Sequence, residues 1–137
     1  MKNDLMFSSK SDEWATPQDL FGALNATFLF DVDLAATAEN AKVPIFYTKE
    51  MDSLSISWSG DTTRKDGPAC GWLNPPYSRG AKFIAKAAEE RCQGFLTVML
   101  LPARTDTKAF HAHIYDAMTG QARPGVEIRF LPGRLKF

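Results

Sequence analysis

The sequence is poor in the residues that build disulfide frameworks and metal centres. Its 137 residues include two cysteines, Cys70 and Cys92, and two histidines, His111 and His113. Two cysteines make no disulfide framework, and histidines two positions apart point in different directions on a helix. We therefore expect free thiols, as in a reducing compartment, and no metal site.

Long apolar runs are also missing. No stretch approaches the ~20 apolar residues of a membrane-spanning helix, and residues 1–5 lack the apolar start of a secretory signal. These absences predict a cytoplasmic protein. A chain of this length with 45% hydrophobic residues can bury the core of one domain. We expect residues 1–11 to form a flexible N-terminus and residues 12–137 to form that single domain.

A net excess of charge is absent, because 16 Lys and Arg balance 16 Asp and Glu. The distribution is nevertheless uneven: residues 1–68 hold 6 basic and 11 acidic side chains, whereas residues 69–137 hold 10 and 5. An acidic half suits a cationic ligand and a basic half suits phosphate, but ordinary surface charge would give the same counts. The charge pattern alone leaves both interpretations open.

What the sequence does contain is an alternation of strand and helix patterns. Apolar periodicity and chain-breaking residues predict strands at 28–34, 69–73, 95–101 and 126–131, an edge strand at 43–47, helices at 17–25, 80–91 and 106–117, and connections at 55–68 and 120–125. Thr16 is the expected N-cap of the first helix, with Pro17 at its first position. The nearly unbroken apolar run at 95–101 is typical of a strand that is covered on both faces.

This alternation predicts an α/β fold with a mostly parallel sheet flanked by helices. Ligands of such sheets bind outside the carboxyl ends of the strands. Asp33 lies near the carboxyl end of one expected strand, and Asn74 and Arg104 follow two others. We therefore expect these three residues to converge on one site.

The most informative segment is Asn74-Pro75-Pro76-Tyr77, directly after the expected strand at 69–73. Neither proline can donate to a strand ladder, so the strand must stop and the loop is stiff. Such a loop can hold a flat ring that carries an amino group, which would stack on Tyr77 and donate hydrogen bonds to the Asn74 oxygen and the Pro75 carbonyl. A strand-ending turn with a surface tyrosine would read the same way. The four residues alone leave both interpretations open.

The loop resembles the Asn/Asp/Ser-Pro-Pro-Tyr/Phe motif of amino-group methyltransferases, and more of the chain resembles the phage-type DNA N6-adenine methyltransferases related to Dam. Ordered segments across residues 12–137 carry this resemblance: DEWATP (12–17), FLFDVDLAA (28–36), DSL (52–54) with Trp58, WLNPPYS (72–78), MLLPARTDT (99–107) and GRLKF (133–137). It implies a Rossmann-like fold that binds S-adenosylmethionine and methylates adenine N6 in double-stranded DNA, in a bacterial or phage-infected cell. Cytosine N4 or a glutamine amide as acceptor, and an inactive truncated binding module, stay as alternatives.

The resemblance also implies roles for individual residues. The catalytic loop is Asn74, Pro75, Pro76 and Tyr77, which would receive a base flipped out of the duplex. The cofactor pocket is expected to include Thr16, Pro17, Asp31, Asp33, Ala35 and Asp52, with Glu39 and Glu50 competing with Asp52 for the ribose. The expected contacts to the DNA backbone are Arg79, Lys82 and Arg104, which could equally be solvated surface residues.

The sequence departs from related patterns at two places. Residues 28–40 contain no glycine, where many methyltransferases have a glycine-rich turn, so Ala35 and Ala36 must fit there. Family members usually continue past the segment 133–137, which leaves C-terminal truncation as an open alternative. In that case we expect the strand at 126–131 to have an open outer edge.

Overall fold

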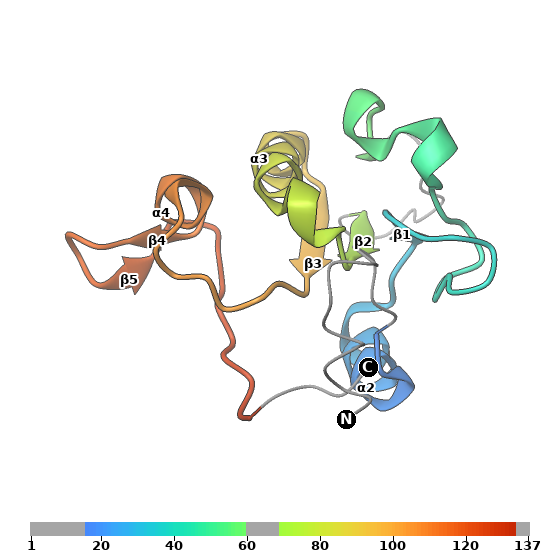
Figure 1. Cartoon of the computed structure of the whole chain (residues 1–137), viewed down its shortest axis with the longest axis horizontal. Helices are drawn as coiled ribbons and strands as arrows, with labels where there is room; N and C mark the ends of the chain where they lie inside the picture. Colours follow the sequence, from blue (N-terminus) through green and yellow to red (C-terminus); the bar gives the residue numbers. More distant parts are fainter. Residues whose placement is uncertain (1–15, 60–68, 134–137) are drawn as a thin grey trace.

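The computed structural model describes residues 16–59 and 69–133 (Figure 1). Three parallel strands, β1 (Val32–Asp33), β2 (Cys70–Leu73) and β3 (Leu96–Met99), form a sheet in the order β1-β2-β3. The predicted α/β class with a parallel sheet is confirmed. The predicted flexible N-terminus at 1–11 lies outside the described residues, as do residues 60–68 of the predicted loop at 55–68.

Both edges of β1 have a neighbouring segment. Residues 43–47, predicted as an edge strand, meet β1 through a single parallel bridge between Asp33 and Phe46. The Asp33 N–H donates to the Ile45 carbonyl and the Tyr47 N–H donates to the Asp33 carbonyl, both at 2.9 Å. Because β2 lies on the other side of β1, the order of neighbours reverses between β1 and β2. Parallel sheets bind ligands at such a reversal.

Helices cover the two faces of the sheet. The helix α2 (Gln18–Phe28) packs Phe21 with Cys70 and Trp72 of β2, whereas α3 (Gly80–Arg91) packs Phe83 in a second cluster with Leu73. Cys70 and Trp72 thus pack with one helix and Leu73 with the other, because successive side chains of a strand point to opposite faces. Figure 1 shows α2 and α3 on opposite sides of the strands.

The core leaves no room for a side chain at Gly71 in the middle of β2. A Cβ at this position would lie 2.8 Å from Cζ of Phe95 and 2.9 Å from Cδ1 of Leu34. Protein interiors are close-packed, so these neighbours have little room to move. The absence of a side chain at Gly71 therefore allows Leu34 and Phe95 to pack directly against this face of β2.

The buried carboxylate of Glu90 connects the segment around Trp58 to α3. Glu90 accepts the Trp58 backbone N–H at 3.1 Å and pairs with Nζ of Lys86 at 2.8 Å. Glu90 and Lys86 are both largely buried, and the Lys86 ammonium also lies 5.7 Å from the centre of the Trp58 ring. The charge of Glu90 is thus compensated, as a buried ion must be.

The helix α2 starts and ends later than predicted. Pro17, not Thr16, is its N-cap, and the helix continues from Gln18 through Phe28 rather than over 17–25. Leu29 then takes a left-handed conformation with φ of 56°, and Asn25 accepts the N–H groups of Leu29 and Phe30 at 2.9 Å each. The predicted strand at 28–34 is therefore reduced to the two residues of β1.

The prediction for α3 matches its observed bounds, and β2 is one residue shorter than predicted. The prediction that residues 95–101 are covered on both faces was wrong: Leu96 is 43% exposed and the other residues of β3 are only half-buried. The reason is position, because within residues 16–59 and 69–133 the strand β3 pairs with β2 alone and forms an edge. In this described part, no helix is long and apolar enough to cross a bilayer.

The C-terminal part differs most from prediction. Instead of a helix at 106–117, α4 (Lys108–His113) is followed by an antiparallel pair, β4 (Tyr115–Asp116) and β5 (Gln121–Ala122), so the predicted turn at 120–125 is partly strand. Arg123 stops the helix, since its backbone N–H donates to Ile114 and its guanidinium Nε donates to the His111 carbonyl, both at 2.8 Å. Figure 1 shows this unit beside α3.

The predicted strand at 126–131 is also absent. Among the described residues this segment pairs with no strand, although its sequence alternates. The Arg129 guanidinium instead lies 5.8 Å from the centre of the Phe28 ring, and Phe130 is 69% exposed. Alternation alone does not create a strand, because a strand also depends on the neighbours against which it packs.

Candidate active site

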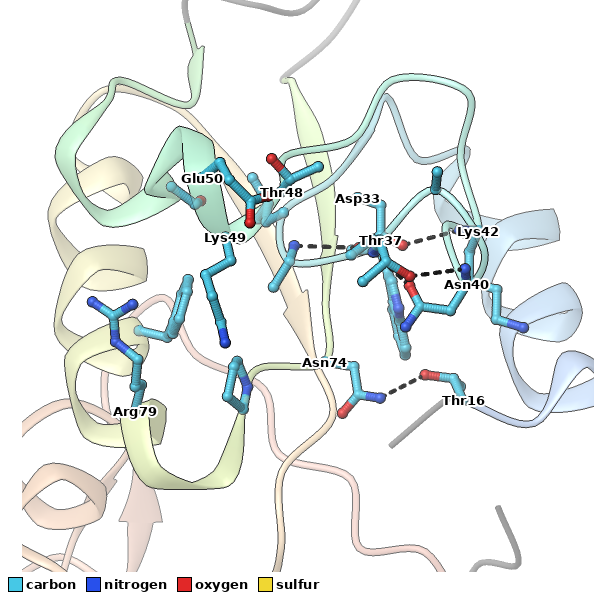
Figure 2. Close-up of a pocket in the computed structure, with 18 of the residues that line it drawn as sticks. Thr16, Asp33, Thr37, Asn40, Lys42, Thr48, Lys49, Glu50, Asn74 and Arg79 are labelled. Atoms are coloured by element: carbon cyan, nitrogen blue, oxygen red, sulfur yellow. Dashed lines mark hydrogen bonds between the residues drawn. The ribbon is translucent and has the colours of Figure 1, made fainter. Parts of the chain in front are cut away.

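A cavity of about 590 Å³ opens where β1 and β2 end (Figure 2). Its walls come from the segment before α2, the loops after β1 and β2, and the short 3₁₀ helices η1 (Lys49–Met51), η2 (Ser53–Ser55) and η4 (Tyr77–Arg79). The predicted site residues that line it are Thr16, Asp33, Ala35, Asp52, Asn74, Pro76 and Arg79. Convergence at the carboxyl ends of the strands is thus observed for Asp33 and Asn74, whereas Arg104 does not line the cavity.

Asp33 is the buried acid of the cavity. Its side chain accepts the backbone N–H of Ala35 at 3.3 Å and that of Lys42 at 3.0 Å, one with each oxygen. The residue is only 3% exposed, and burial raises the pKa of its carboxyl from 3.8 to about 6, while both backbone hydrogen bonds and the nearby Lys42 charge oppose this rise. The carboxylate is therefore ionised at neutral pH and held in one orientation.

The loop after β1 reaches this geometry without glycine. Thr37 and Asn40 bond each other reciprocally: the Thr37 N–H donates to Oδ1 of Asn40 at 2.7 Å, and the Asn40 N–H donates to Oγ1 of Thr37 at 3.3 Å. Of the described non-glycine residues, only Leu29 and Asp52 have positive φ. No position from Ala35 to Asn40 thus requires glycine, which explains the missing glycine-rich turn.

Asn74 stands at the end of β2 and faces the start of the first helix. Its Nδ2 donates a hydrogen bond to Oγ1 of Thr16 at 3.1 Å. Thr16 is 4% exposed and Asn74 is half-buried. Figure 2 shows the Asn74 oxygen on the side of the amide away from Thr16.

In the rest of the predicted catalytic loop, exposure increases from Pro75 to Tyr77. Pro75 is buried, and Pro76 lines the cavity and caps η4 with its carbonyl accepting the Arg79 N–H at 3.0 Å. Tyr77 does not line the cavity and is 44% exposed. Partial burial raises the pKa of the Tyr77 hydroxyl above its ordinary value of 10.0, so the ring is uncharged at neutral pH.

Two residues expected in the cofactor pocket lie outside its lining. Asp31 is turned toward β2, where its Oδ2 accepts the Cys70 N–H at 2.9 Å while its own N–H donates to the Cys70 carbonyl at 2.8 Å. Pro17 caps α2 and its carbonyl accepts the Phe21 N–H at 3.1 Å. These contacts give both residues a part in holding the sheet and the helix together.

Asp52 and Arg79, expected to meet different ligands, lie on the same side of the cavity. Arg79 approaches Oδ1 of Asp52 at 3.9 Å, and both side chains are about half exposed, so the pair is screened and weak. Glu39 and Glu50 also line the cavity, whereas Lys82 lies on the exposed first turn of α3, outside it.

Several lining residues were not predicted from the sequence, among them Asn40, Lys42, Thr48, Lys49 and Ser78. Lys42 matters most, because its backbone N–H holds Asp33 and its Nζ donates to Oε1 of Gln18 at 3.0 Å. The position of Asn40 and Lys42 could have indicated that they line the cavity, because residues 37–42 belong to the loop after β1, at the end of the sheet where ligands bind.

The sequence of the chain is similar to proteins of one described family. The family described as DNA N-6-adenine-methyltransferase (Dam) matches residues 5–137. The chain is 36% identical over 100 residues to the DNA N-6-adenine-methyltransferase of Escherichia phage T1, which covers 72% of this chain and 39% of that protein. It is 34% identical over 112 residues to the DNA N-6-adenine-methyltransferase of Haemophilus phage HP1 (strain HP1c1), which covers 80% of this chain and 60% of that protein.

The chain belongs to the DNA N-6-adenine-methyltransferase (Dam) family, which confirms the family resemblance seen in the sequence. It spans less than two thirds of the length of both phage relatives. No solved structure matches the chain.

Proposed function

We propose that this chain carries the active site of a DNA N6-adenine methyltransferase, which transfers a methyl group from S-adenosylmethionine to adenine N6 in double-stranded DNA. The observation that carries the proposal is the single cavity that joins Asp33, at the end of β1, to Asn74, at the end of β2. Both phage relatives are named DNA N-6-adenine-methyltransferase.

A Rossmann-like arrangement is part of the proposal. Its support is the reversal of strand order between β1 and β2 and the presence of α2 and α3 on opposite faces of the sheet. In doubly wound sheets the ligand crevice lies at this reversal, between the carboxyl ends of the two strands. The cavity lies at that position.

The cavity suits S-adenosylmethionine, the cofactor that methyltransferases of this kind generally use. Its volume of about 590 Å³ falls within the roughly 300–1,000 Å³ of small-molecule pockets. The cofactor is cationic at its sulfonium and amino groups, and Asp33 offers a buried carboxylate whose remaining lone pairs can accept from a cation. Asp52, Glu39 and Glu50 are acceptors on the cavity wall for the ribose hydroxyls. When bound, the cofactor supplies an electrophilic methyl group.

Asn74 and Pro75 would act on the adenine amine. The N6 lone pair is delocalised into the ring, so the amine is a poor nucleophile. Acceptors for both amino hydrogens, the Asn74 oxygen and the Pro75 carbonyl, would favour the tetrahedral amine that forms during transfer. Their stabilisation is greatest in the transition state and so raises the rate.

Tyr77 would hold the base by stacking. The ring is 44% exposed next to the cavity, which supports access for a base that arrives from outside after it is flipped from the duplex. Stacking of a base on an aromatic side chain contributes about 1–3 kcal/mol. Arg79 at the cavity, with Lys82 and Arg104 further out, would contact the phosphates.

Incubation with labelled S-adenosylmethionine and unmethylated duplex DNA, followed by digestion to nucleosides, tests the proposal. The expected product is N6-methyladenine. Label in N4-methylcytosine or in a glutamine side chain would identify a different acceptor. A protein that binds the cofactor but labels none of them would be an inactive binding module, and the proposal would fail.

Asn74→Ala tests the mechanism in the same assay. We expect loss of transfer with nearly unchanged cofactor affinity by calorimetry, because the Asn74 acceptor matters mainly in the transition state. Gln93→Ala, which removes an exposed amide at the end of α3, is the matched control and should keep full activity. Turnover above about a tenth of wild type, a barrier change below ~1.4 kcal/mol, would remove Asn74 from the mechanism.

A further inference from the structure

The hydrogen bond between Thr16 and Asn74 joins two segments that are 58 positions apart. Thr16 precedes α2, and Asn74 ends β2. Oγ1 of Thr16 accepts Nδ2 of Asn74 at 3.1 Å, and Thr16 is almost fully buried (Figure 2). A contact between a buried hydroxyl and the amide of the catalytic loop requires an explanation beyond the capping of α2, since Pro17 is the N-cap.

The two ends of an asparagine amide are nearly equal in shape and opposite in hydrogen bonding. The oxygen accepts and the nitrogen donates, and rotation about the last torsion exchanges them. The adenine amine donates through its N–H groups, so it needs the Asn74 oxygen as hydrogen-bond acceptor, because an N–H facing an N–H is repulsive. A hydrogen-bond acceptor that holds Nδ2 on the far side of the amide therefore keeps the Asn74 oxygen turned toward the adenine amine.

We propose that Thr16 is a positioning residue for methyl transfer: its hydroxyl accepts the Asn74 Nδ2–H and thereby directs the Asn74 oxygen at the target amine. This inference rests on the proposed function. It differs from a contact with the cofactor, which the lining position of Thr16 would also allow. A positioning residue acts on turnover at saturating cofactor, whereas a wall of the cofactor pocket acts on cofactor affinity.

Thr16→Val removes the hydroxyl and keeps the shape of the side chain. We expect the turnover number with duplex DNA to fall at least tenfold while the dissociation constant of S-adenosylmethionine stays within threefold of wild type. Thr16→Ser keeps the hydroxyl and should retain turnover within threefold. Thr27→Val, the same substitution on the exposed surface of α2, is the matched control.

An NMR measurement on the cofactor-free protein detects the hydrogen bond between Thr16 and Asn74 and needs no methyl transfer. The side-chain NH₂ resonances of Asn74, identified by their loss in Asn74→Ala, should shift and exchange faster with solvent in Thr16→Val, and should be unchanged in Thr27→Val. The same spectra show whether each variant is folded, which separates loss of positioning from loss of structure.

The outcomes separate this inference from the proposed function. A Thr16→Val protein with normal turnover at saturation and at least tenfold weaker cofactor binding would overturn positioning in favour of a pocket wall. Equal losses in Thr16→Ser and Thr16→Val, or unchanged Asn74 resonances, would overturn it too. If the wild-type protein transfers no methyl group to any acceptor, the proposed function fails and the positioning role fails with it.

Discussion

Cofactor affinity should depend on pH through Asp33. The carboxyl is 3% exposed, and burial raises its pKa from 3.8 to about 6. If the ionised carboxylate holds a cationic group of S-adenosylmethionine, the cofactor binds the ionised form and binding weakens as Asp33 becomes protonated. The perturbations are a change of pH and the substitution Asp33→Ala.

The size of the effect follows from this pKa. At pH 7.5 nearly all of the Asp33 carboxyl is ionised, and at pH 5.0 about one tenth is, so the dissociation constant should rise about tenfold between these values. Asp33→Ala should remove this dependence. It should also weaken binding at pH 7.5 by on the order of 1.5–3 kcal/mol, the loss of a charge-assisted hydrogen bond.

Protonation of Asp33 has the opposite effect on the stability of the cofactor-free protein: it stabilises the fold, whereas it weakens cofactor binding. Between pH 3.8 and about 6 the folded protein binds more protons at Asp33 than the unfolded chain does. The contribution of Asp33 to stability is therefore fully present below pH 3.8 and is lost as the pH rises through about 6, by at most about 3 kcal/mol.

Isothermal titration calorimetry at pH 5.0, 6.0 and 7.5 measures the binding effect. Groups on the cofactor titrate in the same way with either protein, so the difference between wild type and Asp33→Ala isolates the carboxyl. Asp106→Ala, which removes an exposed carboxylate outside the cavity lining, should behave as wild type. Equal pH dependence in wild type and Asp33→Ala would refute the reasoning.

Two further predictions concern the core and are measured by urea denaturation. Gly71→Ala should lower the free energy of unfolding by about 1–3 kcal/mol through overpacking, whereas Gly22→Ala, where a Cβ meets nothing within 4 Å on α2, should raise it by up to about 1 kcal/mol; equal effects would contradict the close packing at β2. Glu90→Ala should cost about 3 kcal/mol or more, because it leaves the Lys86 ammonium buried without its partner, and the exposed Glu89→Ala on the same helix should cost little. A loss at Glu90 below about 1 kcal/mol would show that the ion pair does not hold this region.

The parts of the fold that the sequence predicts well are bounded by strong local signals. The prolines after Leu73 stop β2, and Gly94, with φ of 84°, follows α3. These residues act through their own backbone restrictions, whatever the chain contacts. Their neighbours β2 and α3 are therefore the elements whose predicted bounds agree best with the structure.

The end of α2 lacks such a signal. Leu29 occupies a left-handed position that usually carries glycine, and the apolar sequence around it reads as a strand. Packing decides the outcome, since Phe28 and Phe30 both contact the cluster that contains Phe21 and Trp72. Side chains distant in the sequence thus favour a helix end where local propensity favours a strand.

The candidate site shows the same division between local and long-range information. Asp33 and Asn74 could be predicted, because one ends and the other follows a strand pattern, and the carboxyl ends of parallel strands meet at one edge of a sheet. The bonds that orient them could not, since Lys42 contacts Asp33 from nine positions further along the chain and Thr16 contacts Asn74 from the segment before α2. Strand patterns therefore locate the chemical groups, while their orientation depends on partners that no local pattern marks. A substitution at Thr16 should consequently be judged by its effect on Asn74, which its hydroxyl contacts, whereas Lys42 holds Asp33 through a backbone N–H that any residue except proline supplies.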